Sequence, residues 1–211
     1  MKVDFLTPET GWFSDVANRL GEEVRRKGHE CRIVRRHEDL ERGELLYILS
    51  YLRIVPPDIL DLHEQNIVIH GSDLPSGRGF SPLSWQILEN PEEVVFTLFE
   101  AAEAVDAGDY YMKRSLPLDG TELFHEWRAK GGALIAEMAL EFLERRTELP
   151  RIAQEGEGTH YRRRSEADDE VLPGESLAQI FDKLRACDPD SYPVWFTHRG
   201  RRYFLRLEPG E

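Results

Sequence analysis

The chain has 211 residues, with 27 Lys and Arg against 40 Asp and Glu, so its formal net charge is −13. Nucleic acids and anionic membranes are bound mainly through Lys and Arg, so this excess of carboxylates argues against both partners. A hydrophobic content of 40% with 10% aromatic residues is typical of a globular protein and not of a disordered acidic chain.

Strands and helices are predicted to alternate in the amino-terminal part. Apolar residues 2–7 predict a strand, and apolar side chains at helical spacing predict a helix over residues 12–27 that ends at Gly28. Further strands are expected at residues 31–34, 45–49 and 66–69, with a short helix over 56–62. This order predicts an α/β protein with a Rossmann-like parallel or mixed sheet flanked by helices.

The rest of the chain divides into a helical and a polar part. A loop over residues 71–81 precedes a predicted helix over 82–88, strands over 94–99 and 110–116, and a long amphipathic helix over 120–146. Residues 150–173 are polar and indicate a connecting arm, and residues 177–207 predict one helix and two strands. We therefore expect a catalytic domain over residues 1–149 and an arm with a small α+β subdomain over 150–211.

The two cysteines, Cys31 and Cys187, have no Cys or His at metal-ligand spacing, so we expect buried, reduced thiols and no metal site. No run of about 18 apolar residues occurs, and the amino terminus lacks the apolar stretch of a signal peptide. We expect a soluble, cytoplasmic protein.

Two polar residues are candidates for chemistry. In an open parallel sheet, ligands bind beyond the carboxyl ends of the strands. His70 ends the fourth predicted strand, and Asp106 lies in the turn Val105-Asp106-Ala107-Gly108 between later strands. A His held by a carboxylate is a common arrangement for moving a proton near neutral pH. We expect both groups at that edge, although position alone leaves a structural role for His70 open.

A longer ordered set of residues resembles the signature of the folate-dependent formyltransferases. The set is His70-Gly71-Ser72-Asp73-Leu74-Pro75, then Gly77, Gly79, Pro82, Trp85, Ile87 and Thr97, and finally Val105-Asp106-Ala107-Gly108-Asp109. Residues 51–56 resemble the segment beside the pterin in that family. Downstream, Tyr161 to Arg164, Asp168, Leu184-Arg185-Ala186 and Tyr192-Pro193 are similar to the small branch that formylates nucleotide-linked amino sugars.

The resemblance implies a formyltransferase fold, and transfer of a formyl group from 10-formyltetrahydrofolate to the primary amine of a nucleotide-linked amino sugar. His70 would serve the oxyanion and the proton transfer, and Asp106 would orient His70. The implied cofactor-binding residues are Tyr51, Leu52, Arg53 and Ile54, expected on a strand beside the folate, with Val105 and Asp106. The implied substrate-binding residues are Ser72, Gly77, Arg78, Tyr161, Arg162, Arg163 and Arg164. The alternative is that the three consecutive arginines bind no substrate and form a solvated basic stretch that balances the surrounding Glu and Asp.

One position departs from the family pattern. The family has an Asn two residues before its His, where this chain has Val68. Asn66 shares the strand face of His70 and is a candidate catalytic replacement, but it lies about 6.7 Å short along the strand at roughly 3.3 Å per residue. Otherwise another donor replaces the Asn, or the protein is slow, altered or inactive.

Three alternatives stay open. One is an acyltransferase of the same fold that uses acetyl-CoA, and another is a methionyl-tRNA formyltransferase, which the net charge disfavours. The third is a homologue that binds the ligands without turnover. The tail over residues 192–207 offers a surface through which the chain could form a homodimer.

Overall fold

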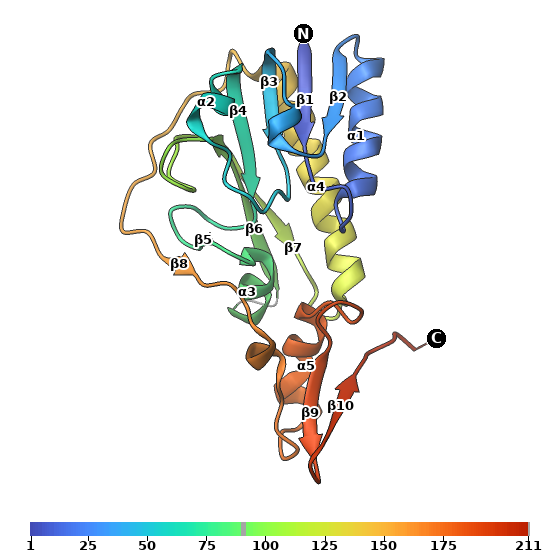
Figure 1. Ribbon diagram of the computed structural model, residues 1–211. Helices are drawn as coiled ribbons and strands as arrows, with labels where there is room; N and C mark the ends of the chain where they lie inside the picture. The colour runs from blue at the N-terminus through green and yellow to red at the C-terminus, as the bar shows by residue number, and fades with distance from the viewer. Residues whose placement is uncertain (90–91, 211) are drawn as a thin grey trace.

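The computed structural model describes residues 1–89 and 92–210, and within these ranges a six-stranded mixed sheet forms the centre of the molecule (Figure 1). Its order is β2-β1-β3-β4-β6-β7. The strands are β1 (Lys2–Leu6), β2 (Glu30–Val34), β3 (Gly43–Ile48), β4 (His63–His70), β6 (Glu93–Glu100) and β7 (Tyr110–Pro117). The first four run parallel, β6 runs antiparallel to β4, and β7 runs antiparallel to β6. The predicted α/β fold with a mixed sheet is confirmed.

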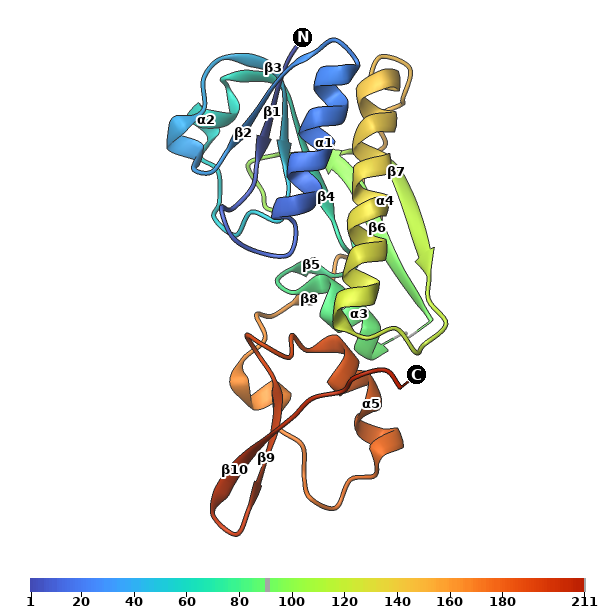
Figure 2. The ribbon, with the colours of Figure 1, turned by 90° about the vertical axis from the view of Figure 1, so that its right-hand side faces the viewer.

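Two long helices cover one face of the sheet side by side, α1 (Ser14–Arg26) and α4 (Phe124–Arg145) (Figure 2). Both helices were predicted, with ends a few residues wider. The apolar stripe of α4 enters the core as expected, with Trp127, Met138 and Phe142 at 1% exposure or less. The Tyr47 hydroxyl on β3 donates to the Ala139 carbonyl at 2.7 Å, which ties α4 to the sheet.

The opposite face of the sheet is covered by short elements only. The single-turn helices η1 (His37–Asp39) and α2 (Pro57–Leu60) lie there, over a second apolar cluster that includes Leu6, Leu46, Ile48 and Val55. Because no long helix of the described residues covers this face, side chains from loops can reach the strands on it.

A buried ionic group lies on this second face, at β1, β2 and β4. The Asp4 carboxylate accepts hydrogen bonds from the Arg32 guanidinium at 2.9 and 2.8 Å and from His63 Nε2 at 3.0 Å. Burial alone would raise the pKa of Asp4, but the hydrogen bonds from Arg32 and His63 outweigh it, so the net pKa is lowered.

Between β4 and β6 the chain forms β5 (Arg78–Gly79) and α3 (Pro82–Glu89). A segment from far along the sequence, β8 (His160–Tyr161), pairs in parallel with β5 (Figure 1). The connecting arm therefore returns to the sheet and packs beside the loop that follows β4. Trp85 of α3 lies half-buried and stacks on Tyr161 at 6.0 Å between ring centroids, so β8 covers it.

The carboxy-terminal part contains η2 (Glu166–Asp169), α5 (Leu177–Ala186) and a hairpin of β9 (Val194–His198) and β10 (Arg201–Leu205). One helix and two strands were predicted here and are confirmed. The buried Arg185 side chain of α5 pairs with Glu122 at 3.2 Å. Trp127 Nε1 donates to the Arg185 carbonyl at 2.8 Å, and the Ser84 hydroxyl donates to the Ala186 carbonyl at 3.2 Å. These contacts dock α5 against α3 and α4.

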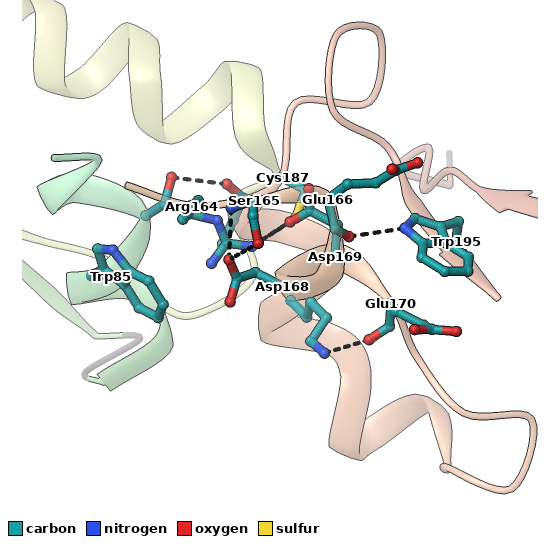
Figure 3. A network of polar contacts seen from close by, with 12 residues as sticks. Trp85, Arg164, Ser165, Glu166, Asp168, Asp169, Glu170, Cys187 and Trp195 are labelled. Carbon is teal, nitrogen blue, oxygen red and sulfur yellow. Dashed lines mark hydrogen bonds and ion pairs between the residues drawn. The ribbon is translucent and has the colours of Figure 1, made fainter. Parts of the chain in front are cut away.

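A polar network joins η2, α5 and the hairpin (Figure 3). Arg164 binds Asp169 at 2.5 Å and also contacts Cys187 Sγ at 3.4 Å. Trp195 Nε1 donates to the Glu166 carbonyl at 3.0 Å. The network holds η2 and the hairpin together, while the division of the chain at residue 149 stays a prediction.

Both cysteines are buried and free, as predicted. Burial raises the pKa of Cys31 to about 11, and burial together with the Asp169 carboxylate raises the pKa of Cys187 to about 12. Within the described ranges, no three His, Cys, Asp or Glu side chains gather where they could hold a metal ion. Nor is any helix there long and apolar enough to span a bilayer.

Candidate active site

His70 is the last residue of β4 and lies at the carboxyl end of the parallel strands. Its Nε2 bonds to the Gly77 carbonyl at 3.0 Å, and its Nδ1 lies 3.9 Å from Asp106 Oδ1. Because a carbonyl oxygen only accepts, this hydrogen bond assigns a proton to Nε2 and turns Nδ1 toward the carboxylate. The side chains are 11% and 12% exposed. The two predicted catalytic groups therefore meet, shielded from bulk water but within reach of a ligand.

Asp106 reaches His70 by a route that the sequence did not suggest. We expected both groups to leave strands at one edge, but β6 is antiparallel, and Glu100 at its end pairs with Ile67 whereas His70 pairs with Thr97. The end of β6 therefore lies beside a residue of β4 that is three positions before His70, a distance of about 10 Å at 3.3 Å per residue. Residues 101–108 must run back along β4 over this distance to bring Asp106 to His70. The Asp106 carboxylate thus approaches the imidazole from a loop that doubles back along the strand.

The loop that carries Asp106 is held tightly. Asp106 has a φ of 54°, in the left-handed region that residues other than glycine rarely adopt. Its Oδ2 accepts from the Gly79 N–H at 2.9 Å. Gly108 has an ordinary φ, but a Cβ there would lie 1.8 Å from the Glu100 carbonyl oxygen. The glycine in the Val-Asp-Ala-Gly turn is therefore required by the close approach of two backbone segments.

The loop after β4 supplies the other wall. Thr97 Oγ1 donates to the Ser72 carbonyl at 2.6 Å and accepts from the Leu74 N–H at 3.3 Å, which fixes the loop on β6. Gly77 and Gly79 have φ of 73° and 100°, as expected of tight turns. A Cβ on Gly77 would also lie 2.5 Å from the Tyr161 ring.

A small cleft of about 120 Å³ opens beside this loop. It is lined by Ser72, Asp73, Ser76, Gln86, Glu89, Glu93, Val95 and Tyr161. Two predicted substrate-binding residues, Ser72 and Tyr161, therefore share one cleft. Of its three carboxylates, Asp73 is paired with Lys113 at 2.6 Å and Glu89 accepts from the Tyr161 hydroxyl, so the cleft suits one small amine or a hydroxylated group.

Residues 51–55, expected on a strand, form a loop after β3, because no strand within residues 1–89 and 92–210 pairs with them. Tyr51 OH lies 3.1 Å from His37 Nδ1, and Arg53 binds Glu38 at 2.7 Å, which lowers the pKa of that carboxyl to about 2. Leu52 and Ile54 are 76% and 73% exposed.

The loop that carries Asp106 also exposes an apolar side chain to solvent. Val105 is 53% exposed there, next to Asp106. Val55 and Ala101, which anchor the two loops, pack on the same apolar cluster. The predicted cofactor residues are thus carried by two loops attached to one face of the sheet.

The three consecutive arginines do not form one site. Arg162 binds Asp168, with its Nη1 at 2.7 Å, and lowers the pKa of that carboxyl well below its usual range. Arg164 is held by Asp169 (Figure 3). Arg163 instead stacks over the Phe80 ring, 4.6 Å from its centroid, and has no carboxylate partner among the residues described. Only Arg163 is therefore available to an anionic ligand.

The structure does not bring Asn66 to the pair. Its Nδ2 donates to the Leu60 carbonyl at 3.1 Å, in the middle of β4 and four residues before His70. The Asn66 amide is therefore bound away from His70, and the side chain of Val68, two residues before His70, has no hydrogen-bonding group.

The arm contributes a residue that sequence reasoning missed. Gln154 Nε2 donates to the carbonyls of Asp106 and Gly108 at 3.0 and 2.8 Å, and Gln154 Oε1 accepts from Arg78 Nη2 at 2.7 Å. Arg78, predicted to bind substrate, thus has a partner within the protein. A single glutamine in a polar segment carries no sequence signal of such a contact.

The comparisons with known proteins agree with this arrangement. Residues 19–133 match the family model described as formyl transferase. The chain is 32% identical over 177 residues to the methionyl-tRNA formyltransferase of Thermus thermophilus, an alignment that covers 80% of this chain and 56% of the relative. The chain therefore spans about half the length of the curated relatives it matches.

Two solved structures show the likeness of the fold. A methionyl-tRNA formyltransferase from Clostridium thermocellum superposes with a TM-score of 0.81 at 25% identity, covering 100% of this chain and 94% of that one. A 4-N formyltransferase from Francisella tularensis superposes with a TM-score of 0.69 at 18% identity, covering 100% and 98%. The family model spans five of the six sheet strands, all but β1, together with His70, Asp106 and both loops that flank them, and the chain therefore belongs to the formyl transferase family.

Proposed function

We propose that the protein is an N-formyltransferase that moves a formyl group from 10-formyltetrahydrofolate to the primary amine of a nucleotide-linked amino sugar. The observation that carries the proposal is the 3.9 Å approach of the Asp106 carboxylate to the His70 imidazole in a chain of the formyl transferase family.

The reaction needs groups that handle charge and protons. The amine nitrogen attacks the formyl carbon and forms the new C–N bond, and negative charge develops on the formyl oxygen. The bond from that carbon to the folate nitrogen then breaks, and its electron pair stays on the folate nitrogen. The amine loses one proton and the folate nitrogen gains one. His70 stabilises the oxyanion and carries the proton, and Asp106 stabilises the cationic form of the ring.

The residues near the pair fit a folate donor. Leu52, Ile54 and Val105 expose apolar side chains on the two loops around the site. A flat heteroaromatic ring such as a pterin would cover this apolar surface and remove it from water. These loops would hold the pterin, and the donor would supply the formyl group.

The acceptor is proposed from charge. A small amine fits the carboxylate-lined cleft at Ser72 and Tyr161. A nucleotide diphosphate needs a guanidinium, and Arg163, next to the β5 and β8 pair, is available for it. The likeness to a 4-N formyltransferase supports this acceptor class, and the net charge of −13 argues against a nucleic acid.

The test follows tetrahydrofolate release with 10-formyltetrahydrofolate and a panel of nucleotide-linked 4-amino sugars. Loss of general acid–base catalysis should lower kcat about 10²- to 10⁴-fold in His70→Ala and Asp106→Asn. The exposed residues His125 and Asp61 provide matched controls, His125→Ala and Asp61→Asn, which should keep wild-type turnover. Full activity of His70→Ala would contradict the proposal. Thermal stabilisation by the ligands without turnover would identify a binding homologue instead.

Methionyl-tRNA is the second acceptor to test, because the relative at 32% identity is a methionyl-tRNA formyltransferase. Formylation of methionyl-tRNA with a steep loss of affinity at high salt, and no reaction with amino sugars, would favour this function. An arm with acetyl-CoA in place of the folate tests the donor. The homodimer stays a prediction that light scattering can check.

A further inference from the structure

Gln154 joins the two loops that form the catalytic pair. Its amide nitrogen donates to the Asp106 and Gly108 carbonyls at 3.0 and 2.8 Å, and its amide oxygen accepts from Arg78 at 2.7 Å. Arg78 lies in β5, in the loop that begins after His70. One side chain therefore links the segment of Asp106 to the segment of His70.

The Gln154 side chain binds the backbone at Asp106, a residue with an unfavourable backbone conformation. The φ of 54° at Asp106 lies in the left-handed region, which a residue other than glycine keeps only when its surroundings hold it. Gln154 binds the carbonyl of Asp106 and that of the residue two positions later, so it fixes the short piece that directs the carboxylate toward His70.

The arm is anchored on both sides of Gln154 by other contacts. Ile152 and Tyr110 exchange two backbone hydrogen bonds, each of 2.9 Å. Thr159 Oγ1 accepts from the Gly77 N–H at 2.8 Å, just before β8 pairs with β5. Because these anchors do not use the Gln154 side chain, the arm should stay in place when that side chain is truncated.

We propose that Gln154 is a positioning residue for formyl transfer: it acts through Asp106 and, by way of Asp106, on His70. The kinetic part of this inference rests on the proposed function. The structural part does not, because it concerns the environment of the His70 ring in the protein without ligands.

The structural test measures the His70 ring signals in ¹H–¹³C NMR spectra of the full chain. We expect Gln154→Ala to move these signals in the same direction as Asp106→Asn. Glu157 is an exposed residue of the same arm, so Glu157→Ala should leave the signals in place. His70 signals that are unchanged in a folded Gln154→Ala protein would overturn the inference. This result needs no substrate, so it stands apart from a failure to find formyl transfer.

The kinetic test uses 10-formyltetrahydrofolate and the acceptor of the panel with the highest turnover. A displacement of about 1 Å can cost about 10²-fold, so Gln154→Ala should lower kcat about 10- to 100-fold with little change in the KM of the donor. In the Asp106→Asn background the same substitution should have almost no further effect, because the two residues act in series. Effects that multiply independently would show a general structural role and overturn the inference.

A conservative variant separates the two sides of the contact. Gln154→Glu keeps an oxygen that can accept from Arg78 but loses both N–H groups that bind the Asp106 and Gly108 carbonyls. We expect it to be as slow as Gln154→Ala. Wild-type kcat in Gln154→Glu would mean that holding Arg78 is sufficient, and it would refute positioning through Asp106.

Discussion

Replacing Gly108 by alanine is a sharp test of the loop geometry. The new methyl group would lie 1.8 Å from the Glu100 carbonyl oxygen, whereas real Cβ atoms essentially never approach closer than 3.0 Å. The obstacle is backbone, so the loop must retreat by about 1.2 Å to reach that limit. Asp106 is two residues away and must move with it.

A displacement of this size predicts a loss of about 10²-fold in kcat. Crowding of this kind also costs about 1–3 kcal/mol of folding free energy, so the melting temperature should fall by several degrees. The assay measures kcat with 10-formyltetrahydrofolate and the best acceptor, and the melting temperature of the same sample. Gly174 is the matched control because a Cβ there has nothing within 4 Å, so Gly174→Ala should behave as wild type. A folded Gly108→Ala enzyme as fast as the wild type would refute the argument that close packing at this glycine sets the position of Asp106.

Three further predictions concern stability and reactivity. Arg185→Met should lower the free energy of unfolding by about 1–3 kcal/mol in urea titrations, because the buried carboxylate and carbonyl of Glu122 lose the guanidinium hydrogen bonds while Lys130 still pairs with the carboxylate. Arg202→Met removes the exposed ion pair with Glu166 and should lower the free energy of unfolding by at most about 1 kcal/mol. Equal losses in Arg185→Met and Arg202→Met would contradict this reasoning. The pKa of Asp4 is lowered on folding, so its stabilisation is complete above its ordinary value of 3.8 and is lost as the pH falls further. The stability gap between wild type and Asp4→Asn, measured by urea unfolding, should therefore shrink below about pH 4, and a constant gap would count against it. With a pKa of about 12, Cys187 should react slowly with a thiol reagent in the native protein and rapidly in urea. A fast reaction in the native protein would contradict the burial and the raised pKa of this thiol.

Periodicity predicted the sheet and its helices well, because burial imposes a pattern on the residues. The stripe of α4 and the apolar strands β1 and β3 are examples, since each buries one face or both. The direction of β6 carries no such pattern, because a buried strand looks the same in either direction. The route by which Asp106 reaches His70 therefore had to come from the structure.

Single contacts between distant segments were the other part that the sequence could not predict. The pairing of β5 with β8 involves two residues on each side, too few for any periodicity. Among the three arginines, Arg163 differs from Arg162 and Arg164 only in its neighbours in space. Residues 51–55 are apolar apart from Arg53, as in a buried strand, yet no strand in the described part of the chain pairs with them.

The return of the arm to β5 affects how this protein can be re-engineered or can diverge. Residues 19–133 match the family model. The side chain that binds the Asp106 carbonyl, Gln154, and the ring that packs on Gly77, Tyr161, both lie beyond that range. A chimaera that takes its carboxy-terminal half from a member of the formyl transferase family would replace Gln154 and Tyr161 together with the surface that we propose for the acceptor. Grafts that seek a new acceptor should therefore place their junction after residue 161, so that the original scaffold of the reacting groups is inherited intact.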